Sequence, residues 1–137
     1  MKIAKYGPDR IAAVVDQKLI DLNIACASHA AHRLGSLRPY AHAGALVPAD
    51  LLEFIKAGKA GLDAAYAALD YAKSEGDGLR GPGGELAVFD LGSTPLRAPL
   101  PSRASKLICM GRNFGKHAAN AQAARAASGV KEQVPES

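Results

Sequence analysis

Short apolar runs separated by turn residues open the chain. Three segments are of strand length and rich in Ile or Val: residues 2–6 (KIAKY), 11–15 (IAAVV) and 19–22 (LIDL). The intervening GPDR and DQK segments carry Gly, Pro and Asp, which favour turns. The pattern predicts a small antiparallel β-meander over residues 1–24.

Residues 25–47 show no clean period, and Gly35, Pro39 and Gly44 interrupt them. We therefore expect a loop with one short helical turn in this region.

Two helices are expected next. In the segment 47–58, Pro48 fits a first helical turn, Asp50 complements the positive end of the helix dipole, and Gly58 supplies a stop. The second helix is predicted from one apolar stripe at positions i, i+3, i+4 and i+7, formed by Leu62, Ala65, Tyr66 and Leu69.

The remaining chain alternates between loop and strand signals. Glycines make residues 74–85 a loop, LAVFDL at 86–91 is a strand, and the prolines of 92–105 predict an extended connector. KLICMG at 106–111 reads as a buried strand, and the alanines that follow permit a helix as far as Ala127. The expected fold class is α+β, a small antiparallel meander with two helices.

Composition adds two limits to this picture. The 137 residues suit one small domain, and 48% are hydrophobic, but aromatic residues make up only 5%. Much of the apolar content is alanine, which buries little area. We therefore expect a thin core that a partner surface would help to complete.

Charge and cysteine content exclude several classes of protein. The net charge is +4, but the 17 basic residues are scattered, which argues against a nucleic-acid-binding surface. The charged N-terminus does not resemble a signal peptide, and no apolar run approaches the length of a membrane span. Cys26 and Cys109 follow no metal-binding spacing and are expected as reduced thiols. We expect a cytoplasmic protein that contacts neither nucleic acid nor membrane.

Most polar residues in the first hundred positions suggest no chemistry. The sequence has no GxSxG motif, and GPGGE lacks the Lys-Ser/Thr that a phosphate-binding loop needs. His29 and His32 have the spacing of one helix face but no acidic or thiol neighbour in register, which disfavours a metal site.

The stretch 106–120 is different because several polar side chains follow the expected buried strand. Gly111 allows a sharp turn, and Arg112, Asn113, Lys116 and His117 come directly after it. The imidazole of His117 titrates near neutrality and could act as a general base, although a surface or helix-capping role is the simpler alternative.

The same stretch resembles the boundary between the N-terminal domain and the catalytic core in the fumarylacetoacetate hydrolase family. That family has an L-x-x-P-x-P connector followed by K-I-I-C-V-G-x-N-Y-x-x-H-x-x-E. The matching positions here are Leu96, Pro99, Pro101, Lys106, Ile108, Cys109, Gly111, Asn113, Phe114 and His117. The opening strands and the helical middle resemble that family's N-terminal domain more loosely.

The resemblance implies hydrolysis, decarboxylation or isomerisation of β-diketo acids, acylpyruvates and related 2-oxo acids, as in the catabolism of aromatic compounds. It implies Mg²⁺ as cofactor, which stabilises the developing enolate. It also implies that His117 activates water together with a Glu, and that Arg112 and Asn113 lie at the rim of the substrate site.

Two departures from the family pattern accompany the resemblance. Asn120 stands where the family often has a Glu, and an amide cannot accept a proton as a carboxylate does. The sequence also contains no E-x-E pair, which supplies metal ligands in that family. We therefore expect no metal ligands in this chain and no activity from it alone.

The resemblance implies a division into an N-terminal domain at residues 1–95 and, at 96–137, a linker with the truncated start of a catalytic core. A missing C-terminal core or a homodimer partner would then complete the site for the small oxo-acid substrate. The alternative is a non-catalytic module that binds another protein.

Overall fold

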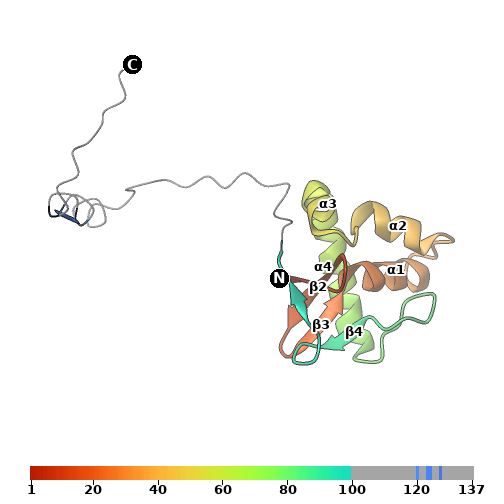
Figure 1. Ribbon diagram of the computed structural model, residues 1–137. Coiled ribbons are helices and arrows are strands. Elements are labelled where there is room, and N and C mark those ends of the chain that lie inside the picture. Colours follow the sequence, from red (N-terminus) through yellow and green to blue (C-terminus); the bar gives the residue numbers. More distant parts are fainter. Residues whose placement is uncertain (100–119, 121–122, 125–126, 128–137) are drawn as a thin grey trace, which may run out of the picture. The chain divides into compact units, whose positions relative to one another are not determined.

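A sheet and four helices form the body of the protein in the computed structural model, which describes residues 1–99, 120, 123–124 and 127 (Figure 1). The elements are β1 (Lys2–Tyr6), β2 (Arg10–Val15), β3 (Lys18–Asp21), α1 (Leu22–His32), α2 (Pro39–Leu46), α3 (Leu51–Lys56), α4 (Gly58–Glu75), β4 (Val88–Asp90) and β5 (Leu96–Arg97). The expected α+β class is confirmed. The strand expected at 106–111, and with it the start of a catalytic core, lies outside the described residues.

The predicted meander over residues 1–24 is confirmed. Its three strands pair antiparallel, with Ala4 opposite Ala12 and Ala12 opposite Asp21. Gly7 in the first turn adopts a positive φ of 56°, which glycine tolerates without strain. Asp16 in the second turn has a φ of 50°, and Asp is among the residues that enter this region most readily.

The five strands form one antiparallel sheet in the order β4-β3-β2-β1-β5. The two edge strands are consecutive in the sequence, and only residues 91–95 connect them. In a flat sheet their separation of four strand spacings, about 19 Å, would demand a nearly extended connector. Instead, residues 91–93 form a turn. The sheet therefore curls, and its two edges approach each other.

The register gives the curled sheet two different faces. Ile11, Ala13 and Ile20 belong to a core shared with the helices, which gather on one side of the sheet in Figure 1. Tyr6, Ala12 and Leu19 form a second, smaller core on the opposite face. Curling allows this inner face to bury side chains that no helix covers.

The loop predicted over residues 25–47 is wrong, because this region contains α1 and α2. The sequence between Ile24 and Ser28 is buried without interruption, so α1 is enclosed on all sides and shows no amphipathic period. Pro39 occupies the first position of α2, where its missing N–H costs nothing. Gly35 lies between the two helices and Gly44 is tolerated inside α2.

The helix expected at 47–58 is confirmed in its centre, with different ends. Asp50 is the N-cap of α3 and accepts hydrogen bonds from the backbone N–H groups of Leu52 and Glu53. Pro48 precedes the helix. Gly58 does not stop the helical course but adopts a φ of 61° and begins α4.

The apolar stripe predicted for the second helix is only half correct. Ala65 and Leu69 are buried, whereas Leu62 and Tyr66 remain 41% and 42% exposed. Small residues dominate the buried side of α4, which consists of Gly61, Ala65, Ala68, Leu69, Tyr71 and Ala72. Small side chains let helix backbones approach closely, so the contact face of α4 follows size rather than hydrophobicity.

Alanine supplies much of the core. Ten of the 22 buried apolar residues in the described part are alanines, and the largest fully buried apolar side chains are Ile11, Leu19, Leu22 and Val47. This composition makes the core dependent on close backbone packing, because each alanine contributes little buried area.

The loop predicted at 74–85 is largely confirmed, although α4 extends through Glu75 and an isolated bridge joins Arg80 to Leu86. The strand predicted at 86–91 is found as β4. Within the predicted connector, Leu96 and Arg97 form β5 opposite Tyr6 and Lys5 of β1. In the described part of the chain, no helix is both long and apolar enough to traverse a bilayer.

Gly61 provides a test of the close packing of α4. A Cβ at this position would lie 2.7 Å from the Cβ of Ala57 and 2.8 Å from the carbonyl oxygen of Leu46. Gly61→Ala should therefore lower the free energy of unfolding by about 1–3 kcal/mol, despite the better helix propensity of alanine. Urea denaturation measures this change.

Gly44→Ala is the matched control, since Gly44 is also helical but has nothing within 4 Å of its added Cβ. This variant should gain up to about 1 kcal/mol. A Gly61→Ala protein as stable as the Gly44→Ala protein would contradict the packing argument.

Cys26 makes stability depend on pH. Burial raises the pKa of its thiol from 9.0 to about 11. The folded state thus favours the neutral thiol, and this contribution is complete below about pH 9 and disappears as the pH rises towards 11. Stability should fall by up to about 1.4 kcal/mol per pH unit across this window.

Urea denaturation under reducing conditions, at several pH values from 8 to 11, checks this expectation. The Cys26→Ala protein should lack this part of the pH dependence, because the thiol has been removed. Parallel pH profiles for the two proteins would contradict the assignment to Cys26.

Candidate functional site

The site predicted from the sequence lies outside the described residues. This holds for the proposed base His117 and for Arg112 and Asn113, which therefore stay predictions. Asn120, at the position where the resemblance would place a Glu, is an exposed helical residue. The candidate chemistry that the structure does describe lies within residues 1–99.

A polar network is buried on the inner face of the sheet around Asp21, whose side chain is fully buried. Its Oδ2 atom accepts hydrogen bonds from the Tyr6 hydroxyl and from Nε of Arg10, the latter at 2.6 Å. Its Oδ1 atom accepts from the backbone N–H of Ile24 at 2.7 Å, which caps α1. One carboxylate therefore ties β1, β2 and the start of α1 together.

The charges of this network favour its present protonation state. Burial, together with the neighbouring Asp21 carboxylate, raises the pKa of Tyr6 above its usual range. The hydrogen bond to Asp21 raises the pKa of Arg10. The carboxylate of Asp21 and the hydroxyl of Tyr6 use their oxygens on groups of the protein itself, so the network is suited to holding the fold rather than to reacting with a ligand.

A pocket of about 630 Å³ lies at the C-terminal ends of α1 and α4. We call it the His32 pocket, and it is lined by Ser28, His32, Arg33, Tyr71, Glu75, Gly78, Leu79, Arg80 and Gly81. Its volume falls within the range of small-molecule sites.

Three polar side chains meet in the wall of the His32 pocket. Nδ1 of His32 lies 3.3 Å from Oγ of Ser28 and 3.1 Å from the hydroxyl of Tyr71. Ser28 comes from the same helix one turn earlier, and Tyr71 comes from α4. Both hydroxyl-bearing residues are buried, with Ser28 at 0% and Tyr71 at 7% exposure.

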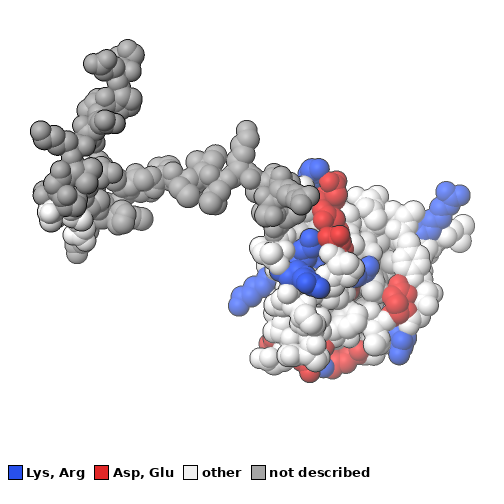
Figure 2. Space-filling view, in the orientation of Figure 1, with Lys and Arg blue, Asp and Glu red and all other residues white. Residues whose placement is uncertain are grey.

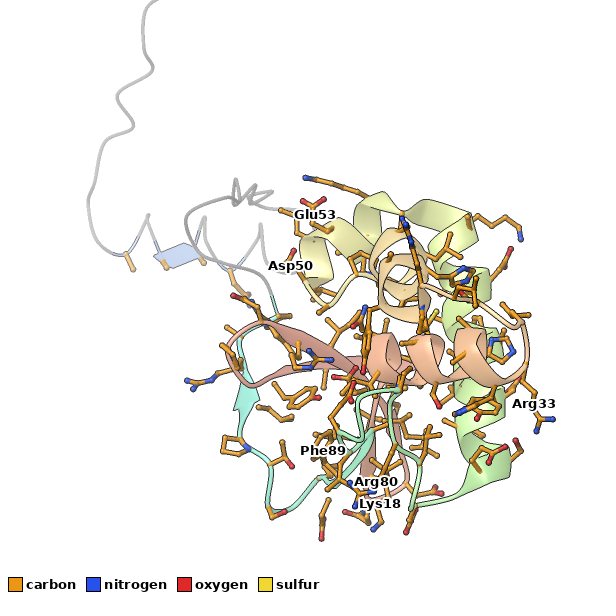
Figure 3. The ribbon with its side chains drawn as sticks, turned by 90° about the vertical axis from the view of Figure 1, so that its right-hand side faces the viewer. Lys18, Arg33, Asp50, Glu53, Arg80 and Phe89 are labelled. Atoms are coloured by element: carbon orange, nitrogen blue, oxygen red, sulfur yellow. The ribbon has the colours of Figure 1, made fainter. Side chains whose placement is uncertain are left out.

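Two arginines add positive charge to the pocket wall. Nη2 of Arg33 pairs with Oε1 of Glu75 at 3.1 Å, and its guanidinium lies 5.4 Å from the centre of the Tyr71 ring. Nη1 of Arg80 donates to the carbonyl of Gly84 at 2.7 Å. Figure 3 shows Arg33 beyond the end of α1, whereas Arg80 belongs to the loop that follows α4, so the two arginines reach the pocket from different segments.

The histidine pair considered as a metal site has other partners. His29 packs its ring against Tyr71, and burial, with the nearby charges of Arg33 and His42, lowers its pKa. Within the described residues no group of three or more His, Cys, Asp or Glu side chains could hold a metal ion. His29 and His32 are thus structural neighbours of Tyr71.

Hydrogen bonds hold the glycine-rich loop at residues 74–85 against α2. The hydroxyl of Tyr40 donates to the Glu85 carboxylate at 2.7 Å and accepts from the N–H of Gly83 at 2.6 Å. Burial and the bond to Glu85 raise the pKa of Tyr40. A Cβ at Gly81 would lie 2.3 Å from Oε1 of Glu85 and 2.8 Å from Cγ2 of Ile24, so a larger residue there would displace both side chains.

Basic and acidic side chains are interspersed on the face of residues 1–99 that Figure 2 shows. Of the six ion pairs in the described part, four join two exposed or half-exposed side chains. Each of the other two has one largely buried partner, Lys5 or Asp21. On that face no extended basic surface is visible.

Sequence reasoning missed both polar clusters. Asp21 ends β3, as the predicted meander requires, but its second role as the N-cap of α1 becomes visible only once α1 is recognised as a helix. Ser28 and His32 have the i, i+4 spacing of helix neighbours, a signal that becomes visible only once α1 is recognised as a helix. Tyr71 lies 39 residues from His32 in the sequence, so no local sequence pattern predicts their contact.

No protein-family model, no curated protein and no solved structure matches this chain. The geometry of the two clusters and the residues of the 106–117 stretch are therefore the grounds for any functional conclusion.

The role of the Asp21 network can be tested by Asp21→Asn. An asparagine still caps α1 but no longer offers a carboxylate to Arg10 and Tyr6. The free energy of unfolding should fall by about 1.5–3 kcal/mol, the range for a hydrogen bond to a charged group. Chemical denaturation at neutral pH measures it.

Asp63→Asn is the control, because Asp63 forms an exposed ion pair with Lys59 at 2.6 Å. Exposed pairs contribute about 0–1 kcal/mol, so this variant should remain close to wild type. Equal losses in both variants would show that the buried network has no special importance.

Proposed function

We propose that this chain is the N-terminal part of an enzyme of the fumarylacetoacetate hydrolase type, which acts on carbon–carbon bonds of β-diketo and acylpyruvate-type acids. The observation that carries the proposal is the stretch 106–117, in which Lys106, Cys109, Gly111, Asn113 and His117 stand at that family's spacing. A proline-containing connector precedes it, as in the family.

The arrangement of the described residues supports this order of parts. A small α+β body precedes the connector, and its opening strands β1–β3 are those expected from the resemblance. The last strand of the body, β5, pairs with β1 just before the prolines of the connector. The sheet thus uses the chain up to the point where the motif-bearing segment begins.

In the proposed reaction His117 takes a proton from the water that attacks the substrate carbonyl. A neutral imidazole is a competent base near pH 7, and it works best when a carboxylate orients it. The amide of Asn120 can hydrogen-bond to a ring nitrogen but cannot take up a proton. Arg112 and Asn113 would bind the carboxylate and carbonyl oxygens of the substrate at the rim of the site.

The residues of this chain do not fit the magnesium site that the family requires. The described part holds no suitable cluster, and the sequence has no E-x-E pair. In the family Mg²⁺ stabilises enolate charge, and under this proposal a C-terminal core contributes its ligands, because a second copy of this chain would lack them as well.

The proposal predicts an inactive chain that becomes active when the acidic core is supplied. Calorimetric titration of the chain with Mg²⁺ should show no micromolar site, and acylpyruvates should release no pyruvate. When the chain is joined to polypeptide that carries the family's E-x-E carboxylates, pyruvate release should appear. In that protein His117→Ala should lower kcat by about 10²-fold or more.

His42→Ala is the matched control, because His42 belongs to α2 and is not part of the 106–117 motif. It should leave kcat unchanged. A micromolar Mg²⁺ site in the chain alone, or full activity after His117→Ala, would overturn the proposal.

A second candidate function is a non-catalytic module that binds another protein. It is favoured by exposed apolar side chains in the segment between α1 and α2, where Leu34 is 57% and Leu37 98% exposed. Size-exclusion chromatography and thermal melting of the chain separate the two candidates. A monomer that melts cooperatively favours the module, whereas aggregation favours part of a larger enzyme.

A further inference from the structure

In the wall of the His32 pocket, hydroxyl donors outnumber the acceptors that they contact. Ser28 and Tyr71 both contact Nδ1 of His32, and the structure gives neither hydroxyl another acceptor among the described residues. A ring nitrogen without a proton has one lone pair and accepts one O–H well. A protonated Nδ1 accepts none. In every protonation state of His32, at least one hydroxyl proton therefore needs another acceptor.

The surplus donor is buried at the pocket wall. Ser28 is fully buried and Tyr71 is 7% exposed, and both line the cavity. A buried hydroxyl proton without an acceptor is costly, so water or a ligand in the pocket has to supply an oxygen or nitrogen lone pair. Nε2 of His32 adds a second group that can face a ligand, because the contacts to Ser28 and Tyr71 both use Nδ1.

The charges next to these hydroxyls indicate which acceptor fits. The guanidinium of Arg33 lies over the Tyr71 ring, and its Nη2 donates a hydrogen bond to Glu75. The remaining N–H groups of Arg33 can therefore donate to a ligand. Arg80 contributes a second guanidinium, anchored through Nη1 on Gly84. Glu75 offsets one of the two positive charges, so the pocket wall keeps one net positive charge.

We propose that the His32 pocket binds a small oxyanion, an organic carboxylate or a phosphate, with one oxygen on the surplus hydroxyl of the Ser28–Tyr71 pair and another on Arg33. The proposal rests on this pocket alone and is independent of the reaction proposed for His117. The volume of about 630 Å³ leaves room for an organic group beyond the anion.

The test is a titration of the ¹⁵N-labelled full chain, followed by two-dimensional NMR. The probes are acetate, pyruvate and inorganic phosphate, at constant ionic strength maintained with chloride. Backbone amides near residues 28–33 and 71–81 should shift and saturate, with a dissociation constant of about 1 mM or lower for at least one probe. Saturation by phosphate only, or by the carboxylates only, identifies the source of the anion.

Three variants make the hydrogen-bond argument specific. Ser28→Ala and Tyr71→Phe each remove one hydroxyl and so remove the surplus, and each should weaken binding about tenfold. Ser28→Ala should do so with no loss of thermal stability, because the remaining Tyr71 hydroxyl satisfies His32. Arg33→Gln should weaken binding by a similar factor.

Arg38→Gln is the control for charge, since Arg38 is exposed, lies in the same loop and does not line the pocket. It should leave the affinity unchanged. Absence of saturable shifts for all three probes would overturn the proposal and would mean that water alone satisfies the hydroxyls. Equal weakening by Arg38→Gln and Arg33→Gln, or unchanged affinity in both hydroxyl variants, would also overturn it.

Discussion

Asp21 connects segments that the sequence separates. Its carboxylate lies at the end of β3, receives Tyr6 from β1 and Arg10 from β2, and caps the first turn of α1. Its backbone N–H also donates to the carbonyl of Ala87, just before β4. A buried carboxylate is tolerated only when its oxygens are satisfied, so the strands and the helix have to meet in one arrangement.

This constraint reaches the His32 pocket through α1. The helix that begins at Asp21 ends at His32, and the same rigid segment carries Ser28 into the wall of the pocket. The small residues of α4 let it approach α1 closely enough for Tyr71 to contact His32. The position of the pocket hydroxyls therefore depends on a capping interaction at the far end of the helix and on close helix packing between.

The strands were predictable from the sequence because alternation and turn residues are local signals. The N-terminal meander is predicted by its Ile- and Val-containing runs and the GPDR turn, and β4 is predicted by the apolar run LAVFDL. The helix α1 was not predictable, because alanine, serine and cysteine buried on all sides give no hydrophobic period. The Asp21 network and the contact between His32 and Tyr71 join distant positions, which periodicity cannot reveal. The assignment of His117 came from motif spacing and stays a prediction.

The short strand β5 determines where the chain leaves the described body. It runs antiparallel to β1, with Leu96 opposite Tyr6 and Arg97 opposite Lys5, so the chain is directed towards the start of β1 where it leaves the sheet. The entry and exit points of residues 1–99 are thus neighbours on one edge of the sheet (Figure 1). A unit whose two ends are adjacent can be inserted into a surface loop of a host protein without disrupting the host fold. The geometry of its ends thus makes this body suitable as an inserted domain.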